Sequence, residues 1–179
     1  MHFRILGRKI LKYLGLTFLS KNLRLWKKYK NCHKGDRCFI ACTGPSLRLE
    51  DLSKLNNEYS FGVNSIVLAY DKTDWRPTYY AMVDIYNLGK FLETNDIPGG
   101  EFAKKLSFFH FRAKTKKPSK KNIFCLINYS NHKKWKMKKK VVKVSKDPSV
   151  CIYDCFTVTN MAIQIAIYMG FSEIYIIGA

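Results

Sequence analysis

The chain has 179 residues, of which 47% are hydrophobic, with 10 glycines and 5 prolines. This length and composition suit one folded domain with a sizeable core and exclude a disordered chain. A formal net charge of +19 predicts attraction to polyanions or to an anionic membrane face.

Residues 1–35 are predicted to form a basic amphipathic N-terminal segment, because 1–34 contain no acidic residue and alternate apolar with basic side chains. The apolar tract is too short and too interrupted by charge to span a bilayer. Two interpretations remain: a helix lying on anionic lipid, or a helix packed on its own domain with a solvated basic face. Leu23, Leu25 and Trp26 would extend the same surface, and 31–35 would be a linker to a domain over 36–179.

That domain opens with a predicted strand over 38–42, a sharp turn over 43–46 and a helix over 47–55. A strand that leads through a Gly-containing turn into a helix is how α/β proteins hold a phosphate, since the first helical N–H groups have no intrahelical partner. The alternative is a plain strand-to-helix connection, because the dinucleotide and Walker spacings are both absent.

Four residues of the turn are candidates for phosphate binding: Thr43, Gly44, Pro45 and Ser46. Gly44 would let the backbone approach a ligand, and Pro45 fixes φ at the helix entry. The Ser46 hydroxyl would either cap the helix or donate to an anion.

Two further predicted strands end in polar residues. The strand over 59–63 ends at Asn64, and the strand over 76–84 ends at Asp84. Ligands of an open parallel sheet sit outside the carboxyl ends of its strands, so both residues should lie beside the turn. Asp84 would bind a sugar hydroxyl, hold a metal or act as a base, the alternative being a helix-capping role.

The C-terminal part is predicted to contain a strand over 150–153, a helix over 161–169 with Thr159 or Asn160 as N-cap, and a buried parallel strand over 173–177. Gly170 would end the helix.

Residues from about 104 to 146 contain no Asp or Glu and are predicted to be a Lys-rich insertion with interleaved aromatic residues. Such a pattern is typical of surfaces that bind single-stranded nucleic acid, an anionic glycan acceptor or phospholipid head groups. The alternative is a Lys-rich segment that is only solvated. Nucleic acid is not favoured, because no nucleic-acid-binding module frames the patch.

The 6 cysteines lack the Cys-x2-Cys spacing of zinc sites, so we predict small buried thiols and no metal site. No cleavable signal peptide is visible, which favours reduced thiols in the cytoplasm.

The chain resembles the bacterial family called 6-hydroxymethylpterin pyrophosphokinase MptE-like. The resemblance is carried by four segments: CTGPSLRLEDL, FGVNSI, TDWRPTYYAMVD and TNMAIQIAIYMGFSEIYIIGA. They are also similar to bacterial lipooligosaccharide sialyltransferases of glycosyltransferase family 42. The likeness runs over about 37–179 with a weak middle over about 88–146. The chain departs from the pattern at Cys42 and Thr43, where the family usually has Gly and Asn.

The resemblance, together with the strand pattern, implies a Rossmann-like α/β fold with a mostly parallel sheet, helices on both faces and a nucleotide site at the strand carboxyl ends. It adds Thr157, Thr159 and Asn160 as donor-nucleotide contacts. In the resembling family, the pattern continues beyond the last strand with an Asp and a later His. The resemblance therefore predicts that this chain is truncated at its C-terminus.

The leading functional prediction is a nucleotide-sugar-dependent glycosyltransferase of bacterial surface polysaccharide or lipooligosaccharide biosynthesis, or its N-terminal part. It would use a CMP-linked donor, an anionic glycan or lipid-linked acceptor and no tightly bound cofactor, in the cytoplasm or on the inner face of the plasma membrane. One alternative is diphosphate transfer from ATP to 6-hydroxymethylpterin, which normally needs Mg²⁺. The other is a non-catalytic basic module that binds membranes or glycans.

Overall fold

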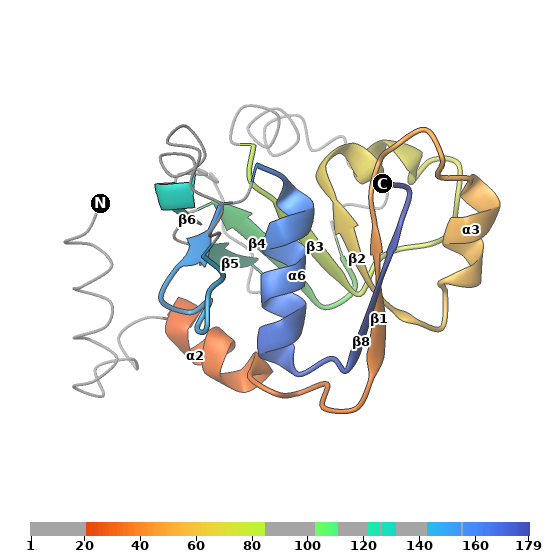
Figure 1. Cartoon of the computed structure of the whole chain (residues 1–179). Coiled ribbons are helices and arrows are strands. Elements are labelled where there is room, and N and C mark those ends of the chain that lie inside the picture. Colours follow the sequence, from red (N-terminus) through yellow and green to blue (C-terminus); the bar gives the residue numbers. More distant parts are fainter. Residues whose placement is uncertain (1–20, 85–102, 111–121, 126, 132–142, 155) are drawn as a thin grey trace.

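The computed structural model describes residues 21–84, 103–110, 122–125, 127–131, 143–154 and 156–179. Their main feature is a six-stranded sheet of order β5-β4-β3-β2-β1-β8, in which every neighbouring pair is parallel (Figure 1). Its strands are β1 (Arg37–Ala41), β2 (Tyr59–Val63), β3 (Tyr79–Met82), β4 (Leu106–His110), β5 (Asn122–Cys125) and β8 (Glu173–Ile177).

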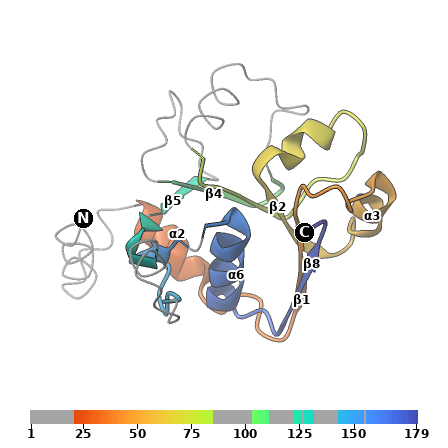
Figure 2. The ribbon, with the colours of Figure 1, turned by 45° about the horizontal axis from the view of Figure 1, so that its top comes forward.

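Helices cover both faces of this sheet, as predicted. Seen obliquely, α2 (Lys21–Tyr29) and α6 (Val158–Met169) lie on one side, and the 3-10 helix η2 (Asn64–Ala69) lies on the other (Figure 2). The short helix α3 (Leu49–Lys54) contributes Leu52 to the same core as η2. The predicted Rossmann-like α/β architecture is therefore confirmed.

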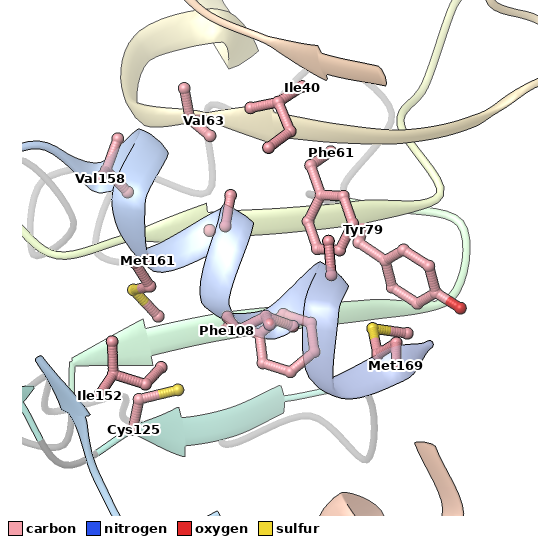
Figure 3. Packing of buried hydrophobic residues seen from close by; sticks show 14 of the residues in the cluster. Ile40, Phe61, Val63, Tyr79, Phe108, Cys125, Ile152, Val158, Met161 and Met169 are labelled. Atoms are coloured by element: carbon pink, nitrogen blue, oxygen red, sulfur yellow. The ribbon is translucent and has the colours of Figure 1, made fainter. Parts of the chain in front are cut away.

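The larger of two hydrophobic cores lies between the sheet and α6 (Figure 3). Alternate strand residues point to it, as the two-residue period of a strand requires. Ile40, Phe61 and Phe108 supply the strand side, and Met161 and Met169 supply the helix side. The opposite core uses the intervening strand positions, including Ala41, Tyr80 and Phe109.

Helix α2 belongs to the first core. The Trp26 side chain is 0% exposed and packs 5.3 Å, centroid to centroid, from both Phe108 and Tyr168. The Tyr168 hydroxyl donates to the Trp26 carbonyl. For Trp26, the structure therefore agrees with the second interpretation, a helix packed on its own domain. Residues 1–20 lie outside the described residues.

The Lys-rich stretch over 104–146 is not an insertion. It contributes β4 and β5 to the main sheet and β6 (Ile127–Asn128) to a separate parallel pair with β7 (Ile152–Tyr153). Leu106, Phe108 and Ile123 are buried there, whereas Lys104 and Lys105 are exposed. The interleaved apolar residues of this stretch therefore serve partly as core strands.

Two strand predictions need correction. The strand over 173–177 is parallel but not buried: it is an edge strand, in which Tyr175 and Ile176 are each 45% exposed. The strand predicted over 150–153 is the short β7, outside the main sheet. Among the described cysteines, Cys38, Cys42, Cys125 and Cys151 are buried free thiols as predicted, whereas Cys32 is exposed, which corrects the prediction at that position.

No helix in the described ranges combines the length and the hydrophobicity that crossing a membrane requires.

The buried Gln164 side chain ties α6 to the segment before it. Its Oε1 accepts from the Ser145 and Tyr153 N–H groups at 2.9 and 3.2 Å. Its Nε2 donates to the Tyr153 and Asn160 carbonyls at 2.8 and 3.1 Å. One amide therefore satisfies polar backbone groups that would otherwise be buried without partners.

We expect Gln164→Leu to lower the free energy of unfolding by about 2–4 kcal/mol, because two N–H groups lose their acceptor. Urea unfolding checks this value. The control is Ile167→Gln on the same helix, where the Ile167 side chain is 53% exposed and the change should be within about 0.5 kcal/mol. Equal losses in the two variants would contradict the account.

His33, placed by the sequence in a linker, is instead a buried polar link at the amino end of the sheet. Its Nδ1 lies 2.9 Å from the Asp36 carboxylate and its Nε2 lies 2.6 Å from the Tyr79 hydroxyl. Because a carboxylate only accepts, Nδ1 donates to Asp36 and Nε2 accepts from Tyr79. Burial lowers the pKa of His33 below its ordinary 6.5, although the Asp36 hydrogen bond acts in the opposite direction.

The unfolded chain therefore binds a proton at His33 at a pH where the folded chain does not, so stability should fall as the pH drops below about 6.5. We expect His33→Gln to flatten this decline between pH 7 and pH 5, measured by urea unfolding at each pH. The lowered pKa values of Asp51 and Glu58 act below this window. An unchanged pH dependence in the variant would rule out His33 as its source.

Candidate functional site

The order of the strands reverses at β1. Strand β1 lies between β2 and β8, so the chain leaves β1 toward one side and later returns through α6 to its other side. Ligands of open α/β sheets bind outside the strand carboxyl ends at such a point of reversal. The predicted turn 43–46 follows β1 directly and lies at this point.

The turn is held against the loop that follows β8. The Gly44 N–H donates to the Gly178 carbonyl at 2.7 Å, and a Cβ at Gly44 would lie 2.6 Å from that oxygen. Gly178 has φ +66° and an equally close contact with Leu47, where an added Cβ would come within 2.8 Å. Glycine is thus required at Gly44 by packing between two loops. The amide that was predicted to approach a ligand is already bonded.

The other turn residues are open to solvent. Thr43, Pro45 and Ser46 are exposed, and the Ser46 hydroxyl makes only a long contact, 3.5 Å, to the Ala179 carbonyl. Helix α3 begins two residues later than predicted, with Arg48 as N-cap and no side-chain cap. The Ser46 hydroxyl therefore does not cap the helix, and its predicted donation to an anion stays a prediction.

The N-terminus of α6 lies against the carboxyl end of β1. The Cys42 thiol and the Thr159 hydroxyl are 3.3 Å apart, which joins the two elements directly. The N-cap is Thr157, not Thr159 or Asn160, and its hydroxyl accepts from the Asn160 N–H at 3.3 Å. Within the described part of the chain, the Val158 and Thr159 N–H groups bond to no acceptor, as expected in a first helical turn.

Asn64 follows β2 in an uncommon backbone conformation, with φ 49°. Asn tolerates this left-handed region better than most residues. The Tyr80 hydroxyl donates to the Asn64 carbonyl at 2.5 Å, and Tyr80 is itself 0% exposed. A buried side chain of β3 thus holds the backbone at Asn64, a contact that the sequence pattern did not indicate.

Asp84 lies two residues beyond β3 and is exposed. Asp36 and Glu58 lie at the opposite, amino end of the sheet. A second carboxylate, Asp154, follows β7 three residues before the Thr157 N-cap of α6 and accepts from the Phe156 N–H at 3.0 Å. No three His, Cys, Asp or Glu side chains of the described residues gather closely enough to hold a metal. The edge therefore offers hydroxyls, amides and the carboxylates of Asp84 and Asp154.

The fold brings every predicted site residue to the same edge of the sheet, although they come from four separate segments. These residues are Thr43, Gly44, Pro45, Ser46, Asn64, Asp84, Thr157, Thr159 and Asn160. Two contacts that hold them, Cys42 with Thr159 and Gly44 with Gly178, link residues far apart in the chain. Their assignment to a ligand stays a prediction.

A sequence profile described as 6-hydroxymethylpterin diphosphokinase MptE-like matches residues 16–179. No curated protein and no solved structure matches the chain. The MptE-like resemblance is confirmed, whereas the likeness to family 42 sialyltransferases finds no support in these matches. The match covers most of the sequence, including α2, all strands of the sheet and the turn 43–46, and the chain belongs to the 6-hydroxymethylpterin diphosphokinase MptE-like family.

Proposed function

We propose that the protein is a transferase that binds the phosphate of a nucleotide-linked donor at the carboxyl edge of its sheet. One observation carries this proposal: the N-terminus of the 12-residue helix α6 contacts Cys42, the residue before the exposed turn 43–46, where the strand order reverses. A helix of this length presents unpaired N–H groups and the positive end of its dipole to an anion.

The donor phosphate would lie between the first turn of α6 and the turn after β1. The Val158 and Thr159 N–H groups would donate from one side, and the Thr43 and Ser46 hydroxyls from the other. Asn64, whose backbone carbonyl accepts from the Tyr80 hydroxyl, would hold ribose or sugar. Donors already fixed in place stabilise charge that develops on a leaving phosphate without a reorganisation cost.

The reaction that this set of groups suits best is glycosyl transfer from a nucleotide sugar, CMP-linked in the first instance. An acceptor hydroxyl would form a bond to the anomeric carbon while the bond from that carbon to the phosphate oxygen breaks. The nucleotide monophosphate leaves with the electron pair, and the acceptor proton passes to the Asp84 carboxylate. A single carboxylate is sufficient for this chemistry.

Diphosphate transfer from ATP to 6-hydroxymethylpterin is the second candidate, favoured by the description of the matching family. The same edge would bind the ATP phosphates, and Mg²⁺ would bridge them to a carboxylate, for which Asp84 is the candidate. The two reactions therefore differ in their nucleotide and in their need for a divalent ion.

We expect CMP to raise the melting temperature without a divalent ion, and Ser46→Ala to weaken CMP binding by about 3–10-fold, as the loss of one hydrogen bond predicts. Thermal shift titration measures both effects. The control is Ser53→Ala, an exposed α3 residue whose hydroxyl donates to the Leu49 carbonyl of its own helix. A response only to ATP with Mg²⁺ would replace glycosyl transfer by the second candidate, and no response to any nucleotide would refute both.

We expect Asp84→Asn to slow the release of CMP from CMP-linked sialic acid, with water as acceptor, by about 10²-fold or more while CMP still stabilises the variant. The neutral amide keeps the size of the side chain but accepts no proton. Asp74→Asn, an exposed position before β3, is the matched control and should retain full activity. Unchanged release in Asp84→Asn would remove this residue from the reaction.

A further inference from the structure

A second hollow opens beside the same turn, on the face of the sheet opposite α6. It encloses about 340 Å³ between the turn, the start of α3 and η2, and we call it the η2 pocket. Its lining residues are Thr43, Gly44, Leu47, Arg48, Leu49, Leu52, Ser65, Ile66, Leu68, Ala69 and Lys72. Thr43 and Gly44 thus border both this pocket and the proposed phosphate site.

The charged side chains that line the η2 pocket are both cationic. Arg48 and Lys72 line it, and no acidic residue does. Neither cation forms an ion pair with any residue that the structure describes. The Ser65 hydroxyl adds a hydrogen-bond donor to this lining. Two cations and a hydroxyl favour a doubly charged anion such as a phosphate.

The hollow on the other flank of α3 provides a contrast. It measures about 570 Å³ and is lined by Asp51, Lys54 and Glu58, among others. Asp51 is bonded to Lys54 at 3.0 Å, and Glu58 pairs with Arg37. The charges of that hollow are therefore already satisfied, so the unpaired cations are a particular property of the η2 pocket.

The rest of the η2 pocket is apolar. Leu52 and Ile66 form a buried floor, whereas Leu49 and Leu68 are 40% and 62% exposed beside it. Exposed leucines next to a cavity favour a ligand that covers them, since burying apolar surface is favourable by about 25 cal/mol per Å². Inorganic phosphate would leave this apolar surface in contact with water.

We propose that the η2 pocket is the acceptor subsite and that it takes a phosphate attached to an apolar body. This inference rests on the proposed function, because a transferase must hold two reactants side by side. Helix α6 packs on one core and η2 on the other, so the sheet separates the two sites except at the turn 43–46. Across Thr43, an acceptor in the η2 pocket lies next to a donor held by α6.

Isothermal titration with hexyl phosphate, inorganic phosphate and hexanol tests the ligand class. We expect hexyl phosphate to bind at least about tenfold more tightly than either half alone, because the phosphate and the apolar chain contact different walls. Equal affinity for hexyl phosphate and inorganic phosphate would overturn the apolar part of the proposal. Absence of hexyl phosphate binding would overturn it entirely.

Charge-neutralising variants test the location. Arg48→Gln combined with Lys72→Gln should weaken hexyl phosphate binding about tenfold or more, since charge-assisted contacts are lost. Lys54→Gln is the control on α3: it removes one positive charge, lies in the other hollow and should change the affinity less than about twofold. Equal loss in the control would overturn the site.

Binding measurements with CMP and hexyl phosphate together distinguish the acceptor subsite from the proposed donor site. Hexyl phosphate and CMP should bind at the same time, each with its affinity unchanged within about twofold, because the sheet and the turn separate their sites. Competition between them would overturn a distinct acceptor subsite. If CMP stabilises the protein and hexyl phosphate does not bind, this inference fails alone. If hexyl phosphate binds and no nucleotide does, the proposed function fails.

Discussion

The hydrogen bond from the Gly44 amide to the Gly178 carbonyl is the contact on which the site depends. It continues the pairing of β1 with β8 beyond the last ladder residues and brings two loops to a separation that no Cβ at Gly44 would allow. The turn after β1 is thereby fixed by backbone, without a side-chain cap on α3. Its hydroxyls remain exposed on a rigid support, as a binding loop requires.

The same turn links the two faces of the sheet. On one face, the thiol of Cys42 contacts Thr159 at the start of α6. On the other, Thr43 and Gly44 border the η2 pocket with its unpaired cations. A single short loop therefore lies between the N-terminus of α6 and a cationic hollow. In the proposed reaction, this arrangement would let a charged donor and a charged acceptor approach each other across Thr43.

The positive charges of the protein differ in their surroundings. Most lysines of the described residues lie on the surface, where they contribute to a general field that attracts anions. Arg48 and Lys72 differ from them because they border a cavity with an apolar floor. The general field would raise the local concentration of anionic substrates, and the two pocket cations would select where an anion stays.

Local patterns in the sequence predicted much of the fold. The strand over Tyr59–Val63, the helix that ends at Gly170 and the parallel arrangement follow from apolar runs and turn residues that act locally. The sequence did not reveal that Glu173–Ile177 is an edge strand, because a short β-branched run looks the same whether one or two neighbours flank it.

Other features were hidden for different reasons. Lysines around β4 and β5 masked the alternation of Leu106 and Phe108, so two core strands were read as an insertion. The set of site residues followed from the strand ends, yet the contacts that hold them did not. The Gly44 N–H donates to the Gly178 carbonyl, and the Asn64 carbonyl accepts from the Tyr80 hydroxyl. Both contacts join residues that only the folded topology brings together, so neighbouring sequence does not indicate them.

A crystal structure of the protein with bound CMP would test most directly whether a nucleotide phosphate binds between the start of α6 and the turn 43–46. The account predicts phosphate oxygens within about 3 Å of the Val158 or Thr159 amide nitrogen and of a Thr43 or Ser46 hydroxyl, as hydrogen bonding requires. A CMP phosphate bound on the lysine surface, away from the first turn of α6, would contradict it.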